Sequence, residues 1–223
     1  MLKLIIGNRA YSSWSMRGWL ALKQSGEEFE ELVVPMFDAE WDQRREGDEF
    51  APSLGKVPIL WDGECVVWDS LAIIEFLADR VGREKFWPED SAARGVARSM
   101  AAEMHSSFAN LRRELPMNVR KSFAPRQLSD GVKGDINRIL QLWAQARARF
   151  GGTGDFLFGE YCAADIMYAP VVTRLITYGV PVPPFAGLYV KAVLSHPAVS
   201  DWIDQAQDEP WVIERYEDAA ASQ

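Results

Sequence analysis

The chain has 223 residues, of which 48% are hydrophobic and 25% are charged, a composition typical of a globular protein with a sizeable core. Its 32 acidic residues outnumber its 24 basic residues and give a formal net charge of −8. This balance favours solubility and argues against nucleic-acid or anionic-membrane partners, because both require clustered Lys and Arg. A small anionic ligand is not excluded, since it needs only a few local positive groups.

The amino terminus predicts a first strand over residues 1–8 rather than a signal peptide, because its apolar run is short and no small-residue cleavage site follows. No apolar run approaches the roughly 20 residues that a membrane helix needs. Cys65 and Cys162 form no CxxC motif, and we interpret them as buried thiols, although a single bridge stays open. We therefore expect a cytoplasmic protein.

Residues 1–81 alternate between strand-like and helix-like segments. Apolar runs predict strands over 2–7, 32–35, 57–61 and 65–68, and helical patterns cover about 13–24, 40–48 and the segment after Leu71. Asp62-Gly63, between the last two strands, is a hairpin signal. The predicted order is β-α-β-α-β-β-α.

The segment over 82–90 is charged, contains a proline and follows neither period, so it predicts a linker over the surface. From 91 to 223 the helical period dominates. One apolar stripe runs through Val96, Met100, Met104, Phe108, Leu111 and Leu115, and a second through Ile136, Leu140, Trp143 and Phe150. Further helices are predicted over 163–178, before Gly179, and around 201–204. We expect an all-helical second domain.

Several familiar catalytic motifs are absent from the sequence. It contains no GxSxG, HExxH, P-loop or Cys-His cluster, and we expect no metal site. His105 and His196 favour a structural role over a catalytic one. Any serine chemistry therefore needs an activation that does not depend on a histidine base.

The segment Tyr11-Ser12-Ser13-Trp14-Ser15 opens the first predicted helix. Taken alone, these serines are typical capping residues, whose oxygens accept the free N–H groups of the first turn. The N-terminus of a helix also carries partial positive charge, which stabilises an anion such as a thiolate. The serines can therefore hold the helix, the sulfur of a ligand, or both.

Two further segments combine structural and ligand-binding interpretations. Val57-Pro58 enters a predicted strand, where an edge-strand proline is the simple interpretation, and a cis bond would expose the backbone of Val57 to an extended peptide. Asp69-Ser70 precedes the third helix as an N-cap. The same pair can receive an amino-acid head group, with the ammonium on Asp69 and the carboxylate on Ser70.

In this order the three segments resemble the glutathione transferase family in its two-domain cytosolic form. The resemblance covers essentially the whole chain and implies a thioredoxin-like domain over 1–81, a linker over 82–90 and a helical domain over 91–223. Ser12, five residues before Arg17, is most similar to the pattern of the serine-using zeta class. The resemblance implies glutathione as co-substrate, a small electrophile as second substrate, and a homodimer.

The family's contacts imply a role for each matching residue. Ser12 would hydrogen-bond the sulfur and act as the catalytic residue, with Ser13 or Ser15 as alternatives. The implied glutathione-binding residues are Ser12, Trp14, Gln43, Lys56, Val57, Pro58, Asp69 and Ser70. The implied second-substrate residues are Trp14, Met104, His105, Phe108 and Arg112, with Met117 and Trp211 as further candidates. Arg112 could favour an acidic substrate.

Two positions depart from the family's pattern. Asp69 stands where Glu or Gln is usual, which keeps a polar group but shortens it. Cys162 occupies the cap of the helix at 163, where Ser or Thr is usual, while Asp165 can still complete a capping box and Tyr161 with Ile166 a hydrophobic staple.

Other functions stay open at this point. Glutathione-assisted isomerisation, of the maleylacetoacetate type, fits the zeta-like serine motif. A Cys-based oxidoreductase is disfavoured, because Ser12 and Ser15 occupy the positions of a CxxC. A non-catalytic ligand-binding protein with a transferase-like fold is the third alternative.

Overall fold

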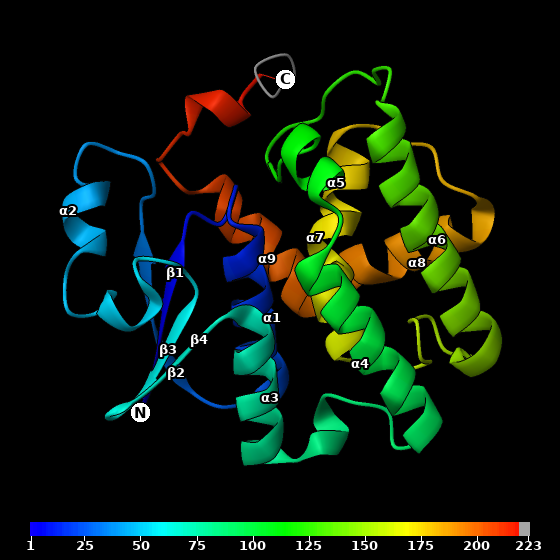
Figure 1. Ribbon diagram of the computed structural model, residues 1–223, viewed down its shortest axis with the longest axis horizontal. Coiled ribbons are helices and arrows are strands. Elements are labelled where there is room, and N and C mark those ends of the chain that lie inside the picture. Colours follow the sequence, from blue (N-terminus) through cyan, green and yellow to red (C-terminus); the bar gives the residue numbers. More distant parts are fainter. Residues whose placement is uncertain (219–223) are drawn as a thin grey trace.

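The computed structural model describes residues 1–218, with a sheet and its helices followed by a helical region (Figure 1). The strands are β1 (Leu2–Gly7), β2 (Phe29–Val34), β3 (Ile59–Asp62) and β4 (Cys65–Trp68). The helices of the first part are α1 (Ser13–Ser25), α2 (Trp41–Arg45) and α3 (Ser70–Val81). The predicted order β-α-β-α-β-β-α is confirmed, and this part has the thioredoxin-like fold.

The four strands form one mixed sheet in the order β2-β1-β3-β4. β1 pairs in parallel with β2 and antiparallel with β3, and β3 pairs antiparallel with β4. Asp62 is still paired with Cys65, so the hairpin turn is Gly63-Glu64 rather than Asp62-Gly63. Gly63 supplies the positive φ of 61° that the turn requires. The predicted hairpin is therefore confirmed with its turn one residue later.

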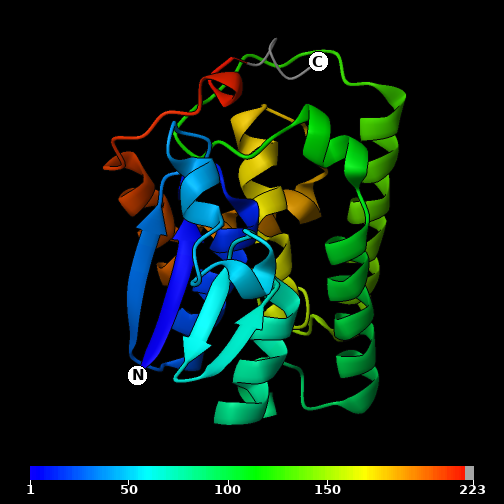
Figure 2. The ribbon, with the colours of Figure 1, turned by 60° about the vertical axis from the view of Figure 1, so that its left-hand side comes forward.

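The helical region contains α4 (Ser91–Ser106), α5 (Ala109–Glu114), α6 (Asp130–Phe150), α7 (Ala163–Thr177), α8 (Pro184–Ser195) and α9 (Pro197–Gln207). The first apolar stripe is split between α4 and α5, because Phe108 adopts a positive φ of 65° and breaks the helix. α8 was not predicted. Figure 2 shows these helices stacked against one side of the sheet domain.

α1 connects the two parts. One of its faces packs on the sheet and on α3, and another contacts α7 (Figure 1). The side chains of α1 are therefore buried nearly throughout the helix. The N-termini of α1 and α3 end up at the same edge of the sheet, facing the helical region.

Two details differ from the sequence-based expectations. The segment over 82–90 is anchored in the core and is not a linker over the surface, because Phe86 and Trp87 are fully buried and the Phe86 carbonyl accepts the Ala163 N–H at 2.7 Å. Cys162 is buried as expected, whereas Cys65 is exposed at the edge of β4. Both thiols are free.

Candidate active site

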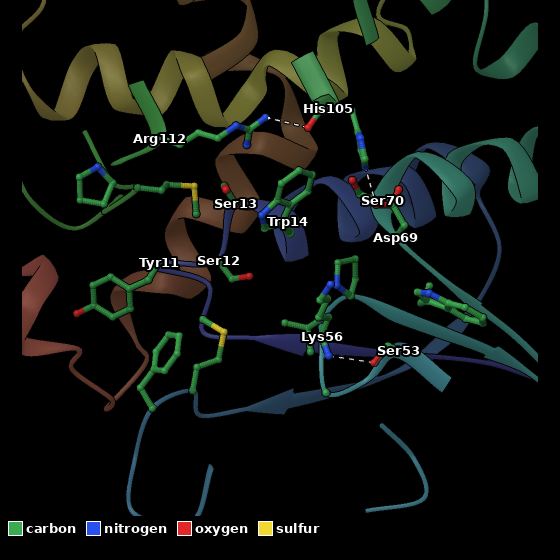
Figure 3. A pocket seen from close by; sticks show the side chains of 18 of the residues that line it. Tyr11, Ser12, Ser13, Trp14, Ser53, Lys56, Asp69, Ser70, His105 and Arg112 are labelled. Atoms are coloured by element: carbon green, nitrogen blue, oxygen red, sulfur yellow. Dashed lines mark hydrogen bonds and ion pairs between the residues drawn. The ribbon is translucent and has the colours of Figure 1, made fainter. Parts of the chain in front are cut away.

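A cavity of about 950 Å³ lies between the sheet domain and the helical region (Figure 3). The predicted site residues that line it are Ser12, Ser13, Trp14, Lys56, Val57, Pro58, Asp69, Ser70, His105 and Arg112, together with Met117. Residues far apart in the sequence thus meet at one site, whose volume is at the upper end of ordinary small-molecule pockets.

Ser12 is the N-cap of α1, and its Oγ accepts the Ser15 N–H at 3.3 Å. The Ser12 hydroxyl donates to the Ser15 Oγ at 2.7 Å, and that oxygen also accepts the Gly7 N–H at 2.9 Å. These bonds tie the end of β1 to the first turn of α1. Because a hydroxyl turns readily, the Ser12 proton can move from Ser15 to a ligand atom. Figure 3 shows the Ser12 hydroxyl in the open middle of the cavity.

Ser13 and Trp14 continue this wall of the cavity. Ser13 is buried, and the Trp14 indole packs edge-on against the His105 imidazole with 5.3 Å between ring centroids. The first turn of α1 carries no acidic side chain. The partial positive charge of this helix end is therefore not neutralised locally, and the site favours an anion.

Asp69 caps α3 from an unusual backbone conformation, with φ at 77° and ψ at 133°. Its Oδ1 accepts the N–H groups of Leu71 at 2.8 Å and Ala72 at 3.4 Å. Its Oδ2 lies 2.5 Å from the His105 Nε2, so this carboxylate links the sheet domain to α4. A left-handed φ in a non-glycine residue is costly and is found most often at functional sites.

Ser70, the first residue of α3, lines the same part of the cavity. Its Oγ is buried and has no hydrogen-bond partner within residues 1–218. A buried hydroxyl without a partner is uncommon in folded proteins, so this one is available to hydrogen-bond a polar group that enters the cavity. The start of α3 can therefore accept one more polar group.

The segment before β3 forms the floor of the cavity. The Val57–Pro58 bond is cis, and Val57 precedes the β-ladder of β3, which begins at Ile59. Lys56 is exposed at the rim, and its backbone N–H donates to the Ser53 Oγ at 3.0 Å (Figure 3). The sequence left a simple edge-strand proline and a cis bond open at this site, and the structure has the cis bond.

Four candidates lie outside the lining of the cavity. Gln43 is exposed on the short helix α2, whose Trp41 lines the cavity instead. Met104 and Phe108 are buried in the core shared by the helices, as their apolar stripe requires. Trp211 contributes a carbonyl that accepts from Arg120. The structure therefore does not bring these four predicted site residues into the lining of the cavity.

The carboxyl-terminal segment supplies part of the cavity that the sequence did not indicate. Tyr216 lines the cavity and packs on Tyr11 with 5.8 Å between ring centroids. The Tyr11 hydroxyl donates to Glu217 at 2.6 Å and accepts from Arg120 at 2.5 Å. Burial is the main reason why the pKa of Tyr11 is raised, so its hydroxyl stays protonated. No local sequence signal connects residue 11 with residues 216–217.

Two searches over the described part of the chain gave no candidate. Residues 1–218 contain no group of three or more His, Cys, Asp or Glu side chains that could hold a metal ion. Within the same residues, no helix combines the length and the apolar character that crossing a bilayer would require.

Comparison with known proteins agrees with this geometry. Residues 11–80 match the family model for the glutathione S-transferase N-terminal domain. The chain is 27% identical over 176 residues to a zeta-class glutathione S-transferase from Euphorbia esula, which covers 74% of this chain and 73% of the relative. It is 23% identical over 160 residues to the glutathione S-transferase GstB of Escherichia coli K12, covering 71% and 72%.

A solved structure shares the fold over nearly its whole length. A glutathione transferase homologue from Burkholderia, with bound glutathione, superposes with a TM-score of 0.70 at 23% identity and covers 93% of this chain and 99% of that one. The N-terminal part of this chain thus matches the glutathione S-transferase domain model, and the chain is similar over about three quarters of its length to curated glutathione S-transferases, which are transferase enzymes.

Proposed function

We propose that this protein is a glutathione transferase that activates glutathione as a thiolate at the N-terminus of α1 and transfers it to a small electrophile. One observation carries the proposal: the N-termini of α1 and α3 open into a single cavity, and each presents a serine hydroxyl, Ser12 and Ser70. Because cytosolic glutathione transferases usually form dimers, we also expect a homodimer in the cytoplasm. Light scattering on the purified protein tests the dimer.

The cavity offers a place for each part of glutathione. The γ-glutamyl carboxylate would accept the unpartnered Ser70 hydroxyl, and its ammonium would bind the Asp69 carboxylate in place of His105. The backbone of Val57 would pair with the cysteinyl unit, and Lys56 would lie near the glycine carboxylate. This orientation brings the sulfur to Ser12.

Thiolate formation is the step that the protein must favour. A free thiol has a pKa of about 8.5 and is mostly protonated at neutral pH. A hydrogen bond from the Ser12 hydroxyl and the partial charge of α1 both stabilise the thiolate, so the thiol proton leaves to solvent without a protein base. The thiolate then attacks the electrophilic carbon, a C–S bond forms, and the leaving group departs with its electron pair.

The test replaces Ser12 by Ala, with Ser13→Ala as the matched control. We expect Ser12→Ala to raise the thiol pKa of bound glutathione by about one unit, to lower turnover at neutral pH about tenfold, and to leave the KM for glutathione nearly unchanged. Turnover should recover at higher pH, where the thiolate forms unaided. Ultraviolet absorbance of the bound thiolate measures the pKa directly.

Two outcomes would change the proposal. Full turnover in Ser12→Ala with a loss in Ser13→Ala would move the role to Ser13. Wild-type protein that binds glutathione but conjugates none of a panel of electrophiles would contradict transfer, and isomerisation of a maleyl-type substrate by the same protein would replace it.

A further inference from the structure

The wall of the cavity opposite Ser12 and Ser70 is built from basic side chains of the helical region. Arg112 on α5 and Arg174 on α7 both line it, and Figure 3 shows Arg112 directed toward the same end of the cavity as Trp14. A third guanidinium, from Arg17 on α1, lies 4.7 Å from the Trp14 ring centroid, the same distance as that of Arg112. We call these three residues the arginine cluster.

The arginine cluster is buried to an extent that is rare for cations. Arg17 is completely buried, and Arg174 is 4% exposed. Both Nη atoms of Arg17 and the Nη1 of Arg112 are buried without any hydrogen-bond partner in residues 1–218. Because an unpaired buried charge is expensive, such groups in folded proteins normally find an anion.

The acceptors around the cluster are backbone carbonyls. Arg17 donates from Nε to the Met167 carbonyl at 3.0 Å. Arg174 donates from Nε to Leu115 at 2.9 Å and from Nη1 to Pro170 at 2.9 Å. These bonds hold the guanidinium groups in fixed positions but bring no negative charge.

Arg112 is held in the same way at the end of α4. Its Nε donates to the Ser107 carbonyl at 3.0 Å, and its Nη2 donates to the carbonyl of Met104. No member of the arginine cluster forms an ion pair with a carboxylate in the described part of the chain. Asp69 interacts electrostatically with Arg17, and Asp135 does so with Arg112. Both carboxylates already have hydrogen-bond partners, since Asp69 binds His105 and Asp135 accepts the Leu111 N–H.

Arg174 nevertheless remains positively charged at neutral pH. Burial, and secondly repulsion by Arg112, lowers the pKa of Arg174 to about 9. Burial is also the main cause that lowers the pKa of Arg17, followed by repulsion from Arg112 and Arg174. Each guanidinium therefore makes the charged form of the others less favourable. An anion in the cavity would reduce this electrostatic repulsion for all three.

We propose that the second substrate carries a carboxylate, which binds at Arg112 and Arg174 while its apolar body packs on Met117. This inference rests on the proposed function and names the substrate class of its second site. The carboxylates of glutathione are not the expected occupants, because Ser70 and Lys56 on the opposite wall receive them. The free Nη1 of Arg112 would gain the partner that it lacks.

The first experiment compares a chloronitrobenzoate with its methyl ester as electrophiles for the wild-type protein and its variants. In both, the thiolate forms a C–S bond at the ring carbon and chloride leaves with the C–Cl electron pair. We expect Arg112→Gln to lower kcat/KM about tenfold for the acid and less than about twofold for the ester. Arg112→Lys, which keeps the charge, should restore part of the loss.

Arg113→Gln is the matched control, because Arg113 is the exposed neighbour that pairs with Glu114 away from the cavity. It should leave both substrates unchanged. Equal losses for acid and ester in Arg112→Gln would overturn the proposal. A rise in the KM for glutathione in that variant, without discrimination between acid and ester, would assign the cluster to glutathione and overturn it as well.

A second experiment does not depend on turnover or on any variant. Calorimetry on the wild-type protein saturated with glutathione should show benzoate binding at least about tenfold more tightly than benzamide. Equal affinities would overturn the inference. If the ester is conjugated and the acid is not, the carboxylate site fails while the transferase function stands. If neither is conjugated but benzoate is preferred, the transferase function fails instead.

Discussion

Asp69 and Asp165 both hold the N-terminus of a helix, and they do so in opposite surroundings. Asp69 caps α3 at the edge of the cavity, and about 40% of its side chain is exposed. Asp165, in the first turn of α7, is completely buried and accepts the N–H groups of Cys162 at 2.9 Å and Leu157 at 3.2 Å. Capping by an aspartate carboxylate therefore occurs at the edge of the cavity in α3 and inside the core in α7.

The two carboxylates differ in whether one of their oxygens is available to a ligand. One oxygen of Asp69 holds the helix, and the other binds His105, a partner that a ligand's ammonium can replace. Both oxygens of Asp165 are bonded inside the protein, and burial raises its pKa to about 6. A capping aspartate becomes a binding residue only where one of its oxygens faces a cavity.

The largest expected effect concerns the buried aspartate. Because the pKa of Asp165 is about 6 in the folded state and 3.8 in the reference state, folding binds a proton between these values. The stability from this group is present below about pH 4 and is lost as the pH rises through about 6, by up to about 3 kcal/mol.

Urea unfolding of wild type and Asp165→Asn at several pH values measures this effect. The difference between the two free energies of unfolding should fall across this window, because the other acids titrate alike in both proteins. A difference that does not change with pH would show that the hydrogen bonds from Cys162 and Leu157 fully offset the effect of burial on the pKa.

The next largest effect concerns the contact between α1 and Pro58, which lines the cavity. Gly18 on α1 lies against Pro58, and a Cβ at this position would come within 2.8 Å of the proline ring. We expect Gly18→Ala to lower the free energy of unfolding by about 1–3 kcal/mol through overpacking, and to raise the KM for glutathione. The control is Gly187→Ala on α8, where a Cβ meets open space. That change should be neutral or stabilising by up to about 1 kcal/mol.

A smaller and purely functional effect is expected at the exposed aspartate. Asp69→Asn keeps an oxygen for the Leu71 N–H but removes the charge, so the KM for glutathione should rise about tenfold with little change in stability. His105→Ala should leave the KM unchanged or lower it, because it frees the second oxygen. Steady-state kinetics tests both variants, and a higher KM in His105→Ala would show that His105 orients Asp69.

The smallest effect is at the cap of α7. Cys162 occupies the N-cap position of the capping box that Asp165 completes. A hydroxyl accepts a hydrogen bond better than a thiol, so Cys162→Ser should be neutral or stabilising by up to about 1 kcal/mol. A lower melting temperature would show that the apolar packing of the thiol matters more than its hydrogen bond.

The elements that sequence predicted well have short-range causes. The alternation in 1–81, the Ser12 cap and the hairpin after β3 follow from local periodicity and turn chemistry. α8 was missed because its apolar residues lie between prolines and lack a polar face of clear period. Phe86 and Trp87 lie in a segment that the sequence predicts to be on the surface, because their neighbours are charged, but both side chains are buried in the core.

The site was predictable where it is built from the starts of elements, and unpredictable where it depends on packing. Ser12, Pro58 and Asp69 occupy positions that local structure already singles out. Met104 and Phe108 look the same whether an apolar stripe faces a core or a cavity, and only the packed helices decide. Arg174 carried no signal, since a basic residue in the last turn of a helix is ordinary.

The anchored segment between the two regions has a consequence for how the protein can change. One apolar cluster runs from β1 through α1 and the Phe86-Trp87 pair to the helices as far as α9. Neither half of the chain therefore has a hydrophobic core that is complete without the other half. The halves are therefore poor modules for recombination with those of other proteins, because exchanging one would leave its partner's buried face mismatched. New substrates are reached more readily by substitutions on the helical wall, which leave that shared interior intact.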